Sequence, residues 1–122
     1  MYEIDSYKTA SGKDEILEYL TELGKKAKTD KSARILANKI DLYFRLFRKN
    51  GTRVGMPVTR HIEAGIWELR PIDERIFYAH WTGNKFILLH HFHKDSQKTP
   101  PLEIEQAKRN LKDWMERNGD NG

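Results

Sequence analysis

The chain has 122 residues, the length of one ordinary domain, and a net charge of +4. It contains no cysteine, which excludes disulfides and thiolate-bound metals. The first residues, MYEIDSYKTASGKDE, include acids and no apolar run, and no stretch approaches the roughly 20 apolar residues of a membrane helix. We therefore expect a soluble, cytoplasmic protein with no secretory signal and no membrane partner.

The first half of the chain is predicted to form a short strand and two helices. Residues 2–8 alternate weakly, which indicates a strand. Residues 11–28 have a helical pattern: Ser11 is the expected N-cap, acids fill the first turns and lysines the last. A second helix is expected from about Asp30 to Lys49, ended by an Asn-Gly pair. A short polar turn joins the two helices, so they should pair as a hairpin.

The second half changes from a helical to an extended pattern. Residues 51–65 have three glycines, one proline and no clear period, and we interpret them as a loop. Three strands then follow at residues 65–71, 75–81 and 85–93, with short turns between them, as in an antiparallel meander. The last element is a helix from Pro101 to about Asn118.

These elements predict an α+β fold in the order β-α-α-β-β-β-α. Residues 1–118 should form one domain, and residues 119–122 should fray. Each helix must bury one of its faces, and one face of the sheet can cover all of them. The other face of the sheet is therefore expected to stay open and polar. Because Trp67 and Leu69 should face the core, alternation leaves Glu68 and Arg70 on the open face.

Three histidines in LLHHFHKDSQKTP raise the question of a metal site. On a regular strand His91 and His93 share one face, and His90 points to the other with Leu88 and Phe92. The three histidines therefore do not form one ligand set, and the chain has no HExxH pair. We predict no metal and no cofactor, and we interpret His90 as a buried, hydrogen-bonded residue.

A nuclease site would use other residues near the same strand end. Attack of a ribose 2′-hydroxyl on its phosphate needs a base, an acid and cations, but no metal. Arg70 and Arg75 flank one turn, and a planar guanidinium suits a phosphate. Glu68 or His93 could be the base, and His93 or Lys94 the acid.

A purely structural interpretation of these charged residues also remains open. Arg70 and Arg75 could simply pair with the acids of a solvated hairpin, Glu68, Asp73 and Glu74, and on pattern alone this is favoured over catalysis.

Basic residues outside this hairpin are equally ambiguous. The segment 48–61 carries Arg48, Lys49, Arg53 and Arg60 with no acid, and Lys98 lies in the turn before the last helix. These residues are either solvated cations or contacts that follow an RNA backbone. The three tryptophans, Trp67, Trp81 and Trp114, are interpreted as core or sheet-edge residues rather than as platforms for bases.

Four stretches in this order, GIWELRP, ERIFYAHW, FILLHHFHKDSQKTP and PLEIEQAKRNLKDW, resemble the phage-derived HigB-like branch of the RelE/ParE toxin superfamily. The resemblance implies a RelE-like domain with a helical hairpin on a four-stranded, mainly antiparallel sheet. It also implies a type II toxin that cleaves mRNA, commonly on the ribosome and without a metal. The partner would be a helix-turn-helix antitoxin, and operator DNA would be bound only through that antitoxin.

Carried over by position, the resemblance implies phosphate-binding roles for Arg75 and Arg70. It also implies a basic role for Lys94, with Lys98 following. The chain departs from RelE-type members at Ile66 and Glu68, where they have lysines, and no tyrosine follows His93. The identity of the general base therefore stays open: Glu68 and His93 are the two candidates, and His91 is the third. Two other functions also stay open: a non-enzymatic, ParE-like inhibitor of DNA gyrase, and a degenerate domain that only binds antitoxin.

Overall fold

The computed structural model describes residues 1–95 and 98–119. The elements in chain order are β1 (Glu3–Ser6), α1 (Glu15–Lys26), α2 (Lys31–Asn50), the 3₁₀ turn η1 (Gly51–Val54), β2 (Thr59–Glu63), β3 (Ile66–Leu69), β4 (Glu74–Thr82), β5 (Lys85–His93) and α3 (Pro101–Asn118). The predicted α+β class is confirmed, as are the three helices. The observed order, β-α-α-β-β-β-β-α, contains one strand more than predicted.

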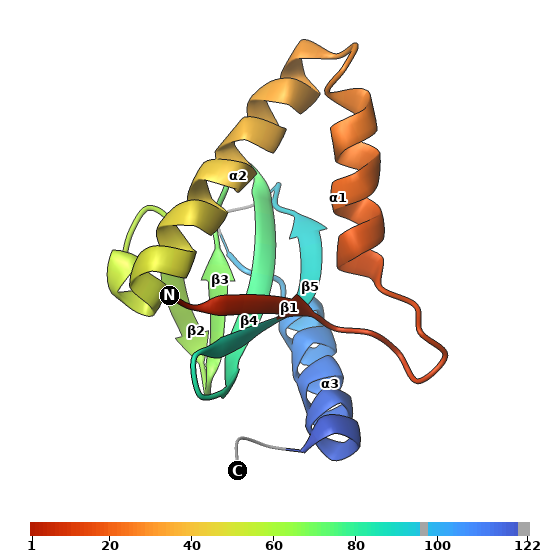
Figure 1. The fold of residues 1–122 in the computed structure, drawn as a ribbon, viewed down its shortest axis with the longest axis vertical. Helices are drawn as coiled ribbons and strands as arrows, with labels where there is room; N and C mark the ends of the chain where they lie inside the picture. Colours follow the sequence, from red (N-terminus) through yellow and green to blue (C-terminus); the bar gives the residue numbers. More distant parts are fainter. Residues whose placement is uncertain (96–97, 120–122) are drawn as a thin grey trace.

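The sheet has five strands in the order β1-β5-β4-β3-β2. Strand β1 runs parallel to β5, whereas the other neighbours are antiparallel, so the sheet is mixed (Figure 1). The expected four strands are one too few because β2 lies in the segment predicted as a loop. Its sequence, TRHIE, has little apolar alternation, and it is held at the sheet edge by pairing with β3.

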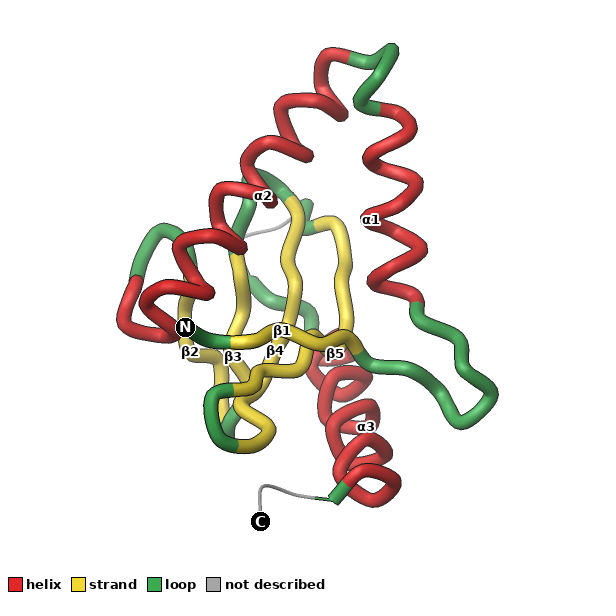
Figure 2. The backbone as a smooth tube through the Cα atoms, in the orientation of Figure 1, coloured by secondary structure: helices red, strands yellow, loops and turns green. Residues whose placement is uncertain are grey.

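The helical hairpin covers one face of the sheet, as the pattern predicts. Helices α1 and α2 meet at the turn near residue 30 and diverge towards the sheet, as the tube trace shows (Figure 2). Ile16 of α1 and Phe47 of α2 pack with side chains of the sheet. The buried sheet residues on this face are Leu69, Ile76, Tyr78, Phe86 and Leu88.

The opposite face is not open, and that prediction is wrong. Helix α3 packs on it through Ala107 and Trp114, against Ile66, Phe77, Ala79, Ile87, Leu89 and Phe92 of the sheet. Glu68 follows Ile66 by two residues on β3, so it lies on the same face, and it is fully buried. The third helix carries an apolar stripe of its own and needs a sheet face to bury it, which the strand pattern alone did not reveal. Trp114 is buried, and Trp67 and Trp81 are half-buried.

Helix α1 begins later than predicted. Its N-cap is Asp14, not Ser11: the Asp14 carboxylate accepts a hydrogen bond from the backbone N–H of Leu17 at 2.9 Å. The second carboxylate oxygen accepts from the hydroxyl of Ser6, which ties the helix start to β1. Helix α2 has Asp30 as its N-cap and ends at Gly51, where φ is +61°.

Parts of two predictions lie outside the described residues. These are Ser96 and Gln97, which were predicted to belong to a turn, and residues 120–122 of the expected frayed tail. Among the residues that are described, no helix combines the length and the apolar character needed to cross a bilayer.

Candidate functional site

A cavity of about 640 Å³ opens at the edge of the sheet where β3 and β5 end and β4 begins. Its walls are Arg60, Arg70, Asp73, Arg75, His93, Lys94 and Asp95. The antiparallel pairing of β4 with its two neighbours brings these strand ends together. Four cations thus share one solvent-accessible space, which we call the cationic cavity.

Glu68 lies beneath this cavity and is fully buried. Its Oε1 atom is 3.1 Å from Nη2 of Arg60 and 3.3 Å from Nε of Arg70. The expectation that Glu68 stands on an open face is therefore wrong, because β3 turns this side chain inwards between two guanidinium groups. One buried carboxylate between two arginines balances charge and holds both side chains in place.

Arg75 is held by backbone oxygens rather than by a carboxylate. Its Nη1 atom donates to the carbonyl oxygens of Ile72 at 2.9 Å and Glu74 at 2.7 Å. Ile72 has φ of +55°, an unfavourable value for a β-branched residue, and its carbonyl is thereby turned towards the arginine. Burial lowers the pKa of Arg75, as do Arg70 and Arg60, while Glu68 opposes them. The guanidinium stays charged at neutral pH.

The cavity has more positive charge than the protein neutralises. The buried Nε atoms of Arg60, Arg70 and Arg75 have no hydrogen-bond partner among the described residues, and neither has the Glu68 carboxylate, which meets Arg60 and Arg70 as an ion pair only. The remaining contacts of Arg60 and Arg70 are weak, a hydroxyl of Thr99 at 3.3 Å and the sulfur of Met56 at 3.2 Å. Buried donors without partners in a cationic cavity are suited to an anion with several oxygens.

Lys94 completes the cluster directly after β5. Its backbone N–H donates to the carbonyl of Asp73 at 2.7 Å, which extends the β4–β5 pairing by one residue. Burial lowers the pKa of the Lys94 ammonium, and the three arginines act in the same direction against Glu68. A lysine that loses its proton more readily than usual is suited to proton donation.

His93 stands at the rim of the cavity, at the last position of β5. Its Nδ1 atom lies 2.6 Å from Oε2 of Glu74, the residue opposite in the strand register. This hydrogen bond raises the pKa of the His93 imidazole, which is otherwise exposed. The other oxygen of Glu74 accepts from the hydroxyl of Tyr19 at 3.1 Å.

The neighbouring histidines are directed away from the cavity. A bulge shifts the β4–β5 register near Leu88, so Leu88 faces the hairpin while His90 and Phe92 face α3, which breaks the predicted alternation. His90 Nε2 lies 2.7 Å from the accepting Oε1 of Glu103 on α3, and His91 stacks on Tyr19 with ring centres 4.3 Å apart. The prediction that His90 points away from His91 and lies with Phe92 is confirmed, whereas the prediction that Leu88 shares this face is wrong. Within residues 1–95 and 98–119, no three His, Asp or Glu side chains gather as a metal site.

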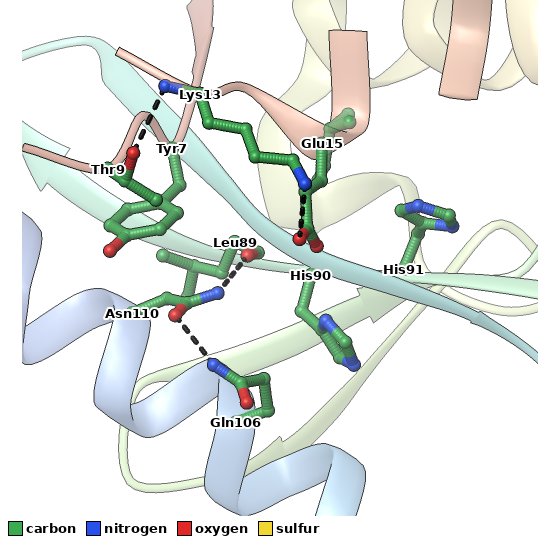
Figure 3. A pocket seen from close by; sticks show the side chains of 10 residues that line it. Tyr7, Thr9, Lys13, Glu15, Leu89, His90, His91, Gln106 and Asn110 are labelled. Atoms are coloured by element: carbon green, nitrogen blue, oxygen red, sulfur yellow. Dashed lines mark hydrogen bonds and ion pairs between the residues drawn. The ribbon is translucent and has the colours of Figure 1, made fainter. Parts of the chain in front are cut away.

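A second cavity, of about 310 Å³, lies between β5, α3 and the segment that joins β1 to α1 (Figure 3). His90 and His91 leave the strand on opposite sides there. Its polar groups largely pair with one another: Asn110 bonds to the carbonyl of Leu89 and to Gln106, and Lys13 lies 3.9 Å from Glu15. Groups that satisfy each other leave little for a ligand to bind, so we place the candidate site at the cationic cavity.

The structure brings together only part of the predicted site. Arg60, Arg70, Arg75, His93 and Lys94 line one cavity, with Glu68 beneath it. Lys49 and Arg53 do not line it: they are exposed at the end of α2 and in η1. Lys98 is exposed before α3.

Sequence reasoning missed two residues of this region. The sequence pattern indicates Glu74 only as a hairpin acid, although the register expected for a β4–β5 hairpin would place it opposite His93. Tyr19 gave no signal, because its contact with Glu74 joins residues far apart in the chain.

Comparison with known proteins gives one family. No curated protein sequence matches the chain. The family described as "Phage derived protein Gp49-like (DUF891)" matches residues 27–112. The match covers more than half of the chain and runs from the end of α1 into α3, including every residue of the cationic cavity. The chain therefore belongs to the phage-derived, Gp49-like protein family.

Proposed function

We propose that this Gp49-like protein is the HigB-like toxin of a type II toxin–antitoxin pair and that it cleaves mRNA without a metal. The observation that carries the proposal is the cationic cavity, in which three arginines and one lysine surround a single buried carboxylate. The motif resemblance to the RelE/ParE superfamily and membership of a phage-derived family support the same function.

The cations would stabilise the phosphate as it gains charge. Arg75 is pre-oriented by two backbone carbonyls, so it needs little reorganisation when substrate binds. Arg70 and Arg60 are held by Glu68, and each keeps donors that can reach an anion. A cluster of this kind favours a pentacoordinate phosphate, which carries more charge than the phosphodiester of the substrate.

Proton transfer would fall to the two residues at the end of β5. His93 takes the proton of the ribose 2′-hydroxyl, whose oxygen then bonds to phosphorus. Lys94 donates a proton to the 5′-oxygen as its bond to phosphorus breaks. The products are a 2′,3′-cyclic phosphate and a 5′-hydroxyl end. Glu68 is assigned to charge balance rather than to proton transfer, because it is buried between two arginines.

The remaining parts of the proposal concern partners. Exposed Lys49, Arg53 and Lys98 would bind the RNA backbone or the ribosome outside the cavity. A helix-turn-helix antitoxin would neutralise the protein and would bind operator DNA on behalf of the complex. The site of action would be the cytoplasm.

The test is to induce the chain in cells and to map new mRNA 5′ ends. We expect cuts that leave a 5′-hydroxyl, and a loss of cutting of about 100-fold or more in Arg75→Lys, which keeps the charge but not the planar fork. Arg109→Ala, an exposed arginine on α3, is the matched control and should cut like the parent. Intact mRNA together with a failure of DNA supercoiling would instead identify a gyrase inhibitor and end the nuclease proposal.

A further inference from the structure

The His93 side chain is held by a residue pair that reaches back into the helical hairpin. Glu74 opens β4 and His93 closes β5, and the antiparallel register sets them opposite each other. His93 Nδ1 lies 2.6 Å from Glu74 Oε2. The carboxylate side chain is only 13% exposed, whereas the imidazole is 61% exposed. A well-packed carboxylate thus orients a ring that solvent and substrate can reach.

Tyr19 fixes the carboxylate from the other side. Its hydroxyl donates to Glu74 Oε1 at 3.1 Å, so each oxygen of Glu74 has its own partner. The Tyr19 ring is itself held by stacking on His91, with ring centres 4.3 Å apart and planes within 20°. Helix α1 is therefore coupled to the rim of the cationic cavity through two hydrogen bonds in series.

We infer that Glu74 and Tyr19 are positioning residues that hold the His93 imidazole with Nδ1 towards the carboxylate and Nε2 free to accept the 2′-hydroxyl proton. This inference rests on the proposed function for the identity of the proton that moves. The arrangement of the three side chains stands on geometry alone.

The chemistry follows from the tautomer. A neutral imidazole carries one N–H, and a carboxylate at Nδ1 keeps that hydrogen there, which leaves the lone pair on Nε2. Nδ1–H then stays bonded to the carboxylate while Nε2 becomes protonated, so the imidazolium is stabilised as it forms.

Other charges also face His93 and must be counted in its titration. They are Asp73 before β4, Asp95 and Lys94 after β5, and Arg60, Arg70 and Arg75 across the cavity. Glu74, Asp73 and Asp95 all favour the charged imidazole. Of these three carboxylates, Glu74 is the one hydrogen-bonded to the imidazole, so its removal should lower the His93 pKa more than removal of Asp73 or Asp95.

A built-in control lies on the opposite face of the same strand. His90 and Glu103 form a pair of the same type at 2.7 Å, but His90 borders the second cavity rather than the cationic one. Tyr7 offers a second control, because its hydroxyl donates to Asp113 at 2.6 Å away from the cationic cavity.

The first experiment needs no activity. Histidine ring ¹⁵N resonances of the full chain are followed against pH in the parent, Glu74→Gln and Glu103→Gln. In the parent His93 should have Nδ1 protonated when neutral and should titrate above its ordinary pKa. Glu74→Gln should lower that midpoint, and Glu103→Gln should leave it unchanged. An unchanged His93 midpoint in Glu74→Gln overturns the inference.

The second experiment uses ribosomes programmed with mRNA and measures the single-turnover cleavage rate against pH. Because the neutral imidazole is the active form, the rate should rise as pH passes the His93 pKa. Glu74→Gln should lower the plateau on the order of 100-fold and move the rising limb to lower pH. A lower plateau with an unmoved limb would mean that Glu74 is merely structural, which overturns its role.

Tyr19 is tested by a double-mutant cycle. Because Tyr19 acts through Glu74, Tyr19→Phe should slow cleavage in the parent but add no further loss in Glu74→Gln. Tyr7→Phe should leave cleavage unchanged in both backgrounds. Additive losses for Tyr19→Phe overturn its positioning role. A parent that cleaves no RNA refutes the proposed function alone, since the ring titration still decides whether Glu74 positions His93.

Discussion

At the scale of single residues, burial decides what a charge can do. Glu68 alternates with apolar neighbours in a strand and is a carboxylate close in the chain to Arg70 and Arg75, which makes it a natural candidate base. Inside the protein the same carboxylate has no exposed surface and lies between Arg60 and Arg70. His93 has the opposite environment, since it is exposed and has one carboxylate partner. Proton transfer therefore fits His93, and charge balance fits Glu68.

The charge-balancing role predicts a large loss of stability in Glu68→Gln. The substitution leaves the neighbouring guanidinium groups without their buried counter-charge, and breaking a buried ion pair from one side costs about 3 kcal/mol or more. Urea denaturation should show this loss. Added inorganic phosphate should stabilise the variant more than the parent, because a bound anion replaces the missing charge.

The control for Glu68 is Glu105→Gln on the surface of α3. Glu105 lies 3.8 Å from Lys108 and is largely exposed, so its removal should change the free energy of unfolding by about 0.5 kcal/mol or less. Equal losses in the two variants would contradict the importance of the buried carboxylate.

At the scale of elements, the ends of the helices connect the hairpin to the sheet. Asp14 caps α1 and also accepts from Ser6 of β1, so one side chain joins a helix start to a strand. Gly51 ends α2 beside Tyr2, whose backbone N–H donates to the carbonyl of Arg48. The Asp14 contacts hold the start of α1, the helix that carries Tyr19, whereas the Tyr2 contact holds the end of α2.

The cap assignment predicts different outcomes for two neighbouring residues. Asp14→Ala removes the acceptor for Leu17 and leaves the Ser6 hydroxyl without this partner, so the free energy of unfolding should fall by about 1–2 kcal/mol. Ser11→Ala should change it by less than about 0.5 kcal/mol, since Ser11 is exposed and outside the helix. Thermal or urea unfolding distinguishes these outcomes, and a larger loss for Ser11→Ala would contradict the observed helix start.

Two glycines should respond to alanine with opposite signs. At Gly51 φ is +61° and an added Cβ would lie 2.9 Å from the Tyr2 ring, so Gly51→Ala should destabilise the protein by about 1–3 kcal/mol. Gly24 lies inside α1, and an added Cβ there would meet no neighbouring atom within 4 Å, so Gly24→Ala should stabilise the protein by about 0.5–1 kcal/mol. Denaturation midpoints provide the measurement, and matching signs would contradict this account of the two sites.

At the scale of the whole molecule, a modest net charge is unevenly distributed. The chain carries only +4 overall, yet four cations, against the two acids Asp73 and Asp95, line one cavity at a single edge of the sheet. The antiparallel pairing of β4 with β3 and β5 brings the strand ends together at that edge. Helix α3 covers the sheet face opposite the helical hairpin. A concentrated positive site on a nearly balanced surface should bind a charged polymer at one place rather than all over.

The clustering of cations in the cavity predicts that RNA binding weakens with salt and that Arg60 contributes to this dependence. Binding of a short RNA that lacks the attacking 2′-hydroxyl should weaken with salt, with a slope of log K against log salt of about −0.7 per phosphate contact. Arg60→Ala should reduce the slope by about 0.7, whereas Arg109→Ala on α3 should not change it. Fluorescence anisotropy at several salt concentrations measures both, and equal slopes in the two variants would contradict binding at the cavity.

Much of the fold could be predicted locally. The limits of β5 and α3, the end of α2 near Gly51 and the opposed directions of His90 and His91 follow from periodicity and turn residues. The hairpin turn between β3 and β4 is short, so Arg70 and Arg75 had to lie near each other. Strand β2 could not be predicted in the same way, since a polar five-residue edge strand has almost no pattern of its own.

By itself, then, the sequence determined every helix and strand except β2 and, outside the β5 bulge, which side chains share a face, because these depend on the 3.6- and 2-residue periods of the backbone. Only the tertiary structure decided that α3 covers the second face of the sheet, that Glu68 is buried between arginines, and that Tyr19 and Glu74 hold His93. Alternation distinguishes one face of a strand from the other but does not say what packs on either. Ion pairs and hydrogen bonds between distant segments form only once packing brings those segments together.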